Sequence, residues 1–99
     1  MSLADDLQRL GVVVGRVVAV TPHPGARAPA YLLTVDLGSH GRYECSVPRG
    51  DYDPEELEGA QLVCARDGDE YAALAAHSHA QGTVLLRPDR EVEDGSVVA

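Results

Sequence analysis

The side chains best suited to ligand binding in this sequence are two arginines and two tyrosines near predicted strands. Arg27 and Arg49 fall in loops that flank strands, where each can contact a ligand or remain a solvated surface charge. Tyr31 and Tyr43 can stack on a base or pack on an apolar peptide side chain. Both rings also belong to the core-facing set of their strands, which favours core packing. Ser46, on the polar face of the second of these strands, completes the candidate residues for peptide or RNA binding.

Other polar side chains give no support to catalysis or metal binding. Ser46 has no histidine or aspartate motif around it, so a nucleophilic role is rejected. The neighbouring acids Glu55 and Glu56 are explained by helix capping. His77 and His79 share a face if they lie on a strand, but two ligands are fewer than a metal site needs. We therefore expect no enzyme activity, no metal and no cofactor.

The charge balance is strongly acidic. Sixteen acidic residues face eight basic ones, all arginine, and the net charge is −8. Such a halophile-like composition favours solubility in concentrated salt and opposes tight nucleic-acid binding by bulk electrostatics. The N-terminus lacks the apolar core of a signal peptide, and no apolar run is long enough to cross a bilayer. These features predict a cytoplasmic protein without membrane insertion.

Chain length and cysteine usage set further bounds. Ninety-nine residues predict one domain, whose core lacks Phe, Trp and Ile and is built from valine, leucine, alanine and tyrosine. Cys45 and Cys64 lie in apolar runs and have the spacing of neither a zinc site nor a redox pair. We expect both to be buried, free thiols.

The longest apolar run, residues 12–20, predicts the central strand. Valine fills most of it, and β-branched side chains favour strands. Gly15 is expected to bend this strand so that it serves two halves of a closed sheet. Apolar residues occupy both alternation sets, so both faces should be covered. Arg16 interrupts the run and is expected to pair with an acid rather than line a groove.

The remaining strands follow from alternation and turn residues. They are expected at residues 31–37, 42–47, 61–65, 71–80 and 83–86, with a possible closing edge strand at 97–98. Loops or turns are expected at residues 21–29, 38–41, 66–70 and 87–90.

Two short helices are predicted by capping signals. Ser2 caps the first, which places Leu3, Leu7 and Leu10 on one stripe and ends at Gly11. This helix either packs on its own barrel or forms a dimer contact. The second spans residues 53–59, with a capping box between its first and fourth residues.

A helix between the third and fourth of five or more short strands predicts an all-β fold with one or two short helices. The layout is that of a five-stranded Greek-key barrel of the OB type with extra terminal strands. Residues 1–99 are expected to form a single domain, with an N-terminal helix at 1–10 and the barrel with its C-terminal extension at 11–99.

Several runs, in this order and spacing, resemble the tRNA-binding-domain family. They are Val14-Gly15-Arg16-Val17-Val18, Pro22-His23-Pro24, Ala26-Arg27, Pro29-Ala30-Tyr31, Val35-Asp36-Leu37-Gly38, Pro54-Glu55-Glu56-Leu57-Glu58-Gly59 and Val84-Leu85-Leu86-Arg87-Pro88-Asp89-Arg90. The pieces at 29–31 and 88–90 look most like the free-standing CsaA-type export chaperones of that family. The chain departs from the family at residues 66–70, where a longer loop that lines the ligand groove is replaced by a short acidic turn.

The resemblance implies a non-catalytic OB-fold homodimer. CsaA-type members bind unfolded or export-destined polypeptide, which here would use a groove near Arg27, Tyr31 and Ser46. Synthetase-fused members bind tRNA, so a tRNA- or RNA-binding protein is the alternative. A third possibility is an interaction domain that has lost its groove.

Overall fold

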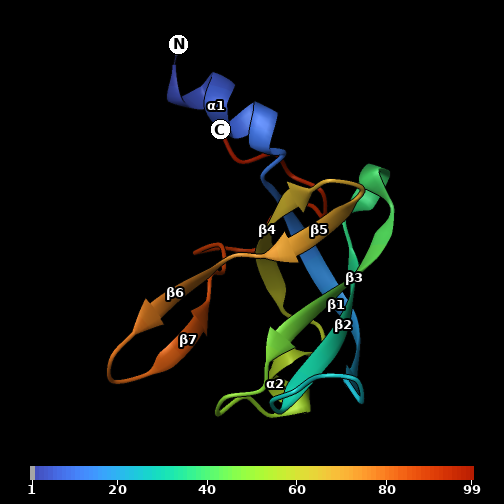
Figure 1. Cartoon of the computed structure of the whole chain (residues 1–99). Helices are drawn as coiled ribbons and strands as arrows, with labels where there is room; N and C mark the ends of the chain where they lie inside the picture. The colour runs from blue at the N-terminus through green and yellow to red at the C-terminus, as the bar shows by residue number, and fades with distance from the viewer. Residues whose placement is uncertain (1) are drawn as a thin grey trace.

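The computed structural model describes residues 2–99 of this chain. Seven strands, two α-helices and one 3-10 turn follow one another along it (Figure 1). The helical segments are α1 (Leu3–Leu10), η1 (Gly38–His40) and α2 (Pro54–Leu57). The strands are β1 (Val13–Pro22), β2 (Ala30–Asp36), β3 (Arg42–Pro48), β4 (Gln61–Asp67), β5 (Glu70–Ala73), β6 (Ala75–Ser78) and β7 (Gly82–Leu85).

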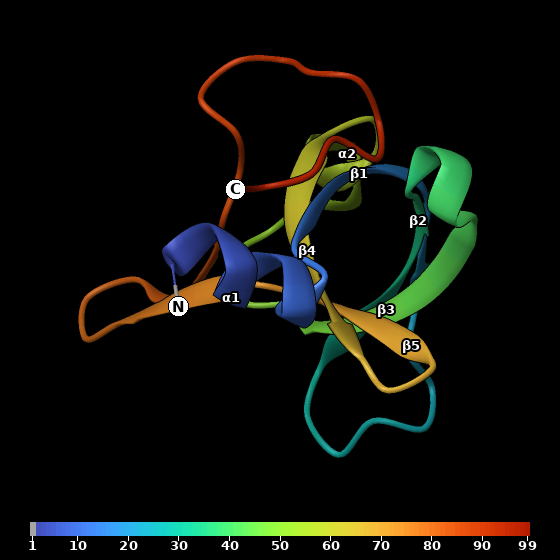
Figure 2. The ribbon, with the colours of Figure 1, turned by 90° about the horizontal axis from the view of Figure 1, so that it is seen from above.

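The first five strands form a nearly closed antiparallel barrel. Their order in the sheet is β3-β2-β1-β4-β5, and Figure 2 shows them as a ring seen from above. The two outer strands meet through side chains: the rings of Tyr43 and Tyr71 lie 4.7 Å apart, and the Cys45 thiol donates a hydrogen bond to the Tyr71 carbonyl. With α2 between β3 and β4, this arrangement confirms the predicted all-β, OB-type fold.

Strand β1 is shared between two partners, as the sequence predicted. It pairs with β4 over residues 13–16 and with β2 over residues 16–22. The pairing of β1 with β2 shifts register between Val17 and Ala19. The predicted position of the bend, at Gly15, is therefore wrong. Gly15 has a different role. A Cβ atom there would lie 2.5 Å from Val35 Cγ1 and 2.4 Å from Leu37 Cδ2.

Strand β1 also runs two residues further than expected. Thr21 and Pro22 were predicted to lie in a loop, but both pair with β2. Proline is accommodated because β4 no longer flanks β1 at this end. The next hydrogen bond along the strand is donated by His23 N–H to the Ala30 carbonyl (3.0 Å).

The barrel core follows the predicted alternation. Along β2 the side chains of Tyr31, Leu33 and Val35 are buried and the residues between them are half-buried. Cys45 and Cys64 are buried free thiols, as expected. The neighbouring Cys45 thiol, together with burial, raises the pKa of Cys64, which keeps this thiol protonated.

The predicted strand at residues 71–80 is divided in two. Leu74 N–H donates to the Val63 carbonyl, and the Leu74 carbonyl accepts from Leu86 N–H, so the chain leaves the barrel at this residue. The following strands β6 and β7 pair only with each other and project as a hairpin (Figure 1). The expected turn at 66–70 is also shorter, because Asp67 and Glu70 pair across it.

Both predicted helices are present. Ser2 caps α1 by accepting the Asp5 N–H, and Gly11 ends it with a φ of 60°. The expected capping box of α2 is formed by Asp53 and Glu56. Across residues 3–10 no side chain of α1 is buried, so this helix does not hide its apolar stripe against its own barrel.

The C-terminal segment returns across the start of β1. Val14 N–H donates to the Ser96 carbonyl (2.9 Å) and Val98 N–H to the Val12 carbonyl (2.9 Å). The predicted edge strand at 97–98 is therefore present as a single bridge between Val13 and Val97.

Two side chains hold this returning segment. Arg16 pairs with Glu91 and Asp94, as expected, and the hydrogen bond with Glu91 is the main reason that the pKa of Arg16 is raised. Gln61 is buried and makes two hydrogen bonds with the backbone of Val92, at 2.6 and 3.1 Å. The C-terminal segment is thus part of the fold rather than a loose extension.

We predict that Gly15→Ala lowers the free energy of unfolding by about 1–3 kcal/mol, because the added methyl group overlaps fully buried side chains. Chemical denaturation measures the change. Gly25→Ala is the matched control, since a Cβ there meets nothing within 4 Å, and it should leave stability unchanged or slightly raised. Equal stability of the two variants would contradict the packing argument.

Candidate ligand-binding site

The loop after β1 and the residues after β3 enclose a hollow of about 400 Å³. Backbone hydrogen bonds hold its walls together: Arg49 N–H donates to the Pro29 carbonyl (3.0 Å), and Ala26 N–H donates to the His23 carbonyl (3.2 Å). The two prolines and one glycine of this loop restrict and direct its path. The lining residues are Pro22, His23, Ala26, Arg27, Ala28, Pro29, Ala30, Tyr31 and Arg49.

The charge of this hollow is opposite to that of the chain. Its lining includes Arg27 and Arg49 and no acidic residue, in a sequence with sixteen acids. Within residues 2–99 neither of these arginines forms an ion pair, whereas Arg9, Arg16 and Arg42 do. Two guanidinium groups are therefore free to donate hydrogen bonds to a ligand.

The predicted site residues are brought together only in part. Arg27, Tyr31 and Arg49 line the same hollow. Ser46 lies beside it, with its hydroxyl 2.9 Å from Nδ1 of His23. Tyr43 lies outside this group, because it packs on Tyr71 where β3 meets β5.

Tyr31 belongs mainly to the core. Its side chain is 7% exposed, and its hydroxyl donates to the Tyr52 carbonyl (2.8 Å). This agrees with the alternation of side chains along the strand, which favoured core packing for Tyr31. The ring forms the floor of the hollow rather than an exposed stacking platform.

His23 also lines the hollow, although it was not among the residues predicted to bind a ligand. The proline on each side of it was a usable signal, because it fixes the backbone around the imidazole. For metal binding, no group of three or more His, Cys, Asp or Glu side chains gathers within residues 2–99. His77 and His79 lie exposed on the projecting hairpin and its turn.

Sequence comparison finds methionine–tRNA ligases. The enzyme of Thermococcus kodakarensis is 31% identical over 100 residues, and that of Pyrococcus abyssi is 32% identical over 103. These matches cover 93% and 95% of this chain but only 13% and 14% of the enzymes' length. No family model matches the sequence.

Structure comparison finds chaperones of the same length. CsaA of Bacillus anthracis superposes with a TM-score of 0.86 and 28% identity over 100% of this chain and 99% of that one. CsaA of Picrophilus torridus gives 0.84 and 25%, with both chains fully covered. The chain is CsaA-like over its full length, which confirms the predicted resemblance to the tRNA-binding-domain family.

A further structural match concerns the fold alone. A MetRS-related protein of Pyrococcus horikoshii shares the fold with a TM-score of 0.76 at 18% identity. The likeness to CsaA supports a binding module. None of the helices described within residues 2–99 has both the length and the apolar character needed to span a membrane.

We predict that Tyr31→Phe lowers the free energy of unfolding by about 0.5–1.5 kcal/mol, because it removes the hydrogen bond to Tyr52 while keeping the ring. Thermal or chemical denaturation measures this. Tyr43→Phe is the control, because the Tyr43 hydroxyl makes no hydrogen bond with any residue in the range 2–99. Unchanged stability together with lost ligand binding would instead make Tyr31 a ligand-contacting residue.

Proposed function

We propose that this CsaA-like chain is a non-catalytic chaperone that binds unfolded or export-destined polypeptide as a homodimer in the cytoplasm. The observation that carries the proposal is the end-to-end match to CsaA chaperones, at 100% of this chain and 99–100% of theirs. The match covers the barrel, α1 and the C-terminal segment together.

The hollow beside Arg27 and Arg49 is the binding surface that we propose for polypeptide. Alanine, proline and the Tyr31 ring supply apolar contacts, while the two arginines can donate hydrogen bonds to peptide carbonyls, and Ser46 lies beside them. Apolar contacts persist in concentrated salt, which suits the strongly acidic composition.

The homodimer proposal comes from α1. Leu3 is 73% exposed and Leu10 is 56% exposed, and both lie on the apolar stripe of this helix. Val97, 57% exposed, belongs to the C-terminal segment near the same end of the barrel (Figure 1). Contact between two copies would remove this apolar surface from water.

Binding of tRNA is the second candidate. The identity to methionine–tRNA ligases favours it, and so does the acid-free lining around Arg27 and Arg49. The net charge of −8 opposes it, because phosphate binding depends on cationic contacts and weakens as salt rises.

The first functional prediction separates these candidates. The chain should suppress aggregation of a chemically unfolded model protein at both low and high salt, and Arg27→Gln combined with Arg49→Gln should reduce this activity severalfold. Arg87→Gln is the control for loss of surface charge, since Arg87 is exposed and lies outside the hollow. Filter binding of tRNA runs in parallel.

The two assays distinguish tRNA binding from chaperone activity. Binding of tRNA with a log–log salt slope of roughly −1.4 to −1.8, lost in the double variant, would favour the second candidate, since each of two neutralised phosphates contributes about 0.7–0.9 to the slope. Aggregation unaffected by the chain at any salt concentration would reject the chaperone proposal.

The second functional prediction concerns the dimer. Leu3→Glu should convert the dimer to a monomer in sedimentation velocity, because it places a charge in an apolar contact. Gln8→Glu adds the same charge to an exposed position of α1 off the stripe and should leave the dimer intact. A wild-type chain that sediments as a monomer would refute the proposal.

A further inference from the structure

The outer edge of β7 carries backbone groups that pair with no other strand described within residues 2–99. Leu86 N–H donates to the Leu74 carbonyl (3.0 Å), and Leu85 N–H donates in the opposite direction to the Tyr52 hydroxyl (3.0 Å). In an antiparallel pair the backbone direction alternates from residue to residue. Thr83, two residues before Leu85 and paired with His77, therefore points its N–H and C=O away from β6.

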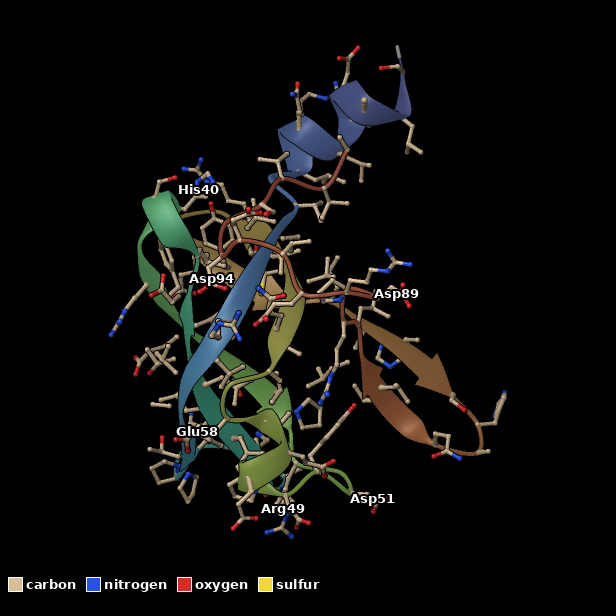
Figure 3. The ribbon with its side chains drawn as sticks, turned by 180° about the vertical axis from the view of Figure 1, so that it is seen from behind. His40, Arg49, Asp51, Glu58, Asp89 and Asp94 are labelled. Atoms are coloured by element: carbon tan, nitrogen blue, oxygen red, sulfur yellow. The ribbon has the colours of Figure 1, made fainter. Side chains whose placement is uncertain are left out.

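This edge opens into a hollow of about 210 Å³. Asp51, Tyr52 and Glu56 line it from the barrel side, and Gln81, Thr83 and Val84 line it from the hairpin. In Figure 3 Asp51 lies on the side of its loop that faces the hairpin, which stands away from the barrel. The free edge thus faces an open hollow whose second wall is formed by the barrel.

The hollow is acidic and partly apolar. No basic residue lines it, and within residues 2–99 Asp51 forms no ion pair. Glu56 accepts the Asp53 N–H in the capping box of α2. On the outer face of the hairpin, Val84 and Leu86 are 37% and 40% exposed, so they offer apolar contacts to alternate side chains of an added strand.

We propose that the outer edge of β7, between Thr83 and Asp51, binds an extended basic segment of polypeptide as an added strand. The Thr83 N–H and C=O hydrogen-bond to the backbone of the segment, and a lysine or arginine of the segment pairs with Asp51. Strand addition uses main-chain hydrogen bonds for affinity and side-chain contacts for selectivity. The inference rests on the proposed function in taking polypeptide as the client, but its site is separate from the arginine-lined hollow.

The test uses a fluorescein-labelled six-residue peptide of alternating lysine and valine, followed by fluorescence anisotropy. Thr83→Pro should weaken binding about threefold to tenfold, the loss expected for one or two hydrogen bonds. His77→Pro is the matched control, because it removes the outward N–H from the other edge of the same hairpin, and it should bind normally. Asp51→Asn should weaken binding about twofold to fivefold at low salt and have little effect in 1 M salt.

Backbone recognition is tested without changing the protein. The same peptide with alternate backbone nitrogens methylated should bind the wild-type chain at least tenfold more weakly, and a glutamate–valine peptide should also bind more weakly. In NMR titrations the Thr83 amide should shift with the lysine–valine peptide. This arm keeps the proposal testable if Thr83→Pro does not fold.

Three results would overturn the inference. Equal binding of the methylated peptide would exclude strand addition, and equal loss in the His77→Pro and Thr83→Pro variants would indicate general damage to the hairpin. A change of oligomeric state in Thr83→Pro would assign the edge to a second copy of this chain. If the lysine–valine peptide fails to bind while unfolded protein is still held through Arg27 and Arg49, only this inference is lost. If neither the peptide nor unfolded protein binds, the proposed function fails as well.

Discussion

The close packing of β1 beneath Val35 and Leu37 is the constraint on which the rest of the barrel depends. At Gly15 the two layers approach so closely that even one methyl group does not fit without displacement. On either side of this point β1 pairs first with β4 and then with β2. The C-terminal segment bonds to Val12, just before this strand, and to Val14 within it. One strand therefore sets the positions of the other elements that meet in the core.

Local patterns predicted the parts of the fold that local forces decide. Alternation identified β2 and β3, and the capping signals identified α1 and α2. The break at Leu74 was missed because its cause is not local: the Leu74 backbone bonds to Val63 and Leu86. The role of Gly15 was misjudged for the same reason, since its neighbours are twenty and more residues away in sequence.

The candidate site was likewise predictable only where local sequence patterns determine it. Strand parity correctly placed Tyr31 in the core, and the loop residues Arg27 and Arg49 were identifiable as candidates from the sequence. That these two arginines share one hollow depends on the contact between Arg49 N–H and the Pro29 carbonyl, which no spacing rule predicts. The separation of Tyr43 from the group likewise follows from barrel closure, where it meets Tyr71.

Two hollows of opposite charge lie toward the same end of the molecule. In Figure 3 Arg49 and Asp51 are labelled close together there, one lining the arginine-containing hollow and the other the hollow at β7. An acidic protein thereby presents both signs of charge within a short distance. Salt weakens attraction to either exposed group, so apolar contacts would carry more of any binding in concentrated salt.

Both ends of the chain lie beyond the opposite pole of the barrel, close to α1 and away from α2 (Figure 1). A protein domain joined to either end would extend outward from that pole and leave the two hollows uncovered. The geometry thus allows the barrel to be attached to a larger polypeptide without covering either hollow.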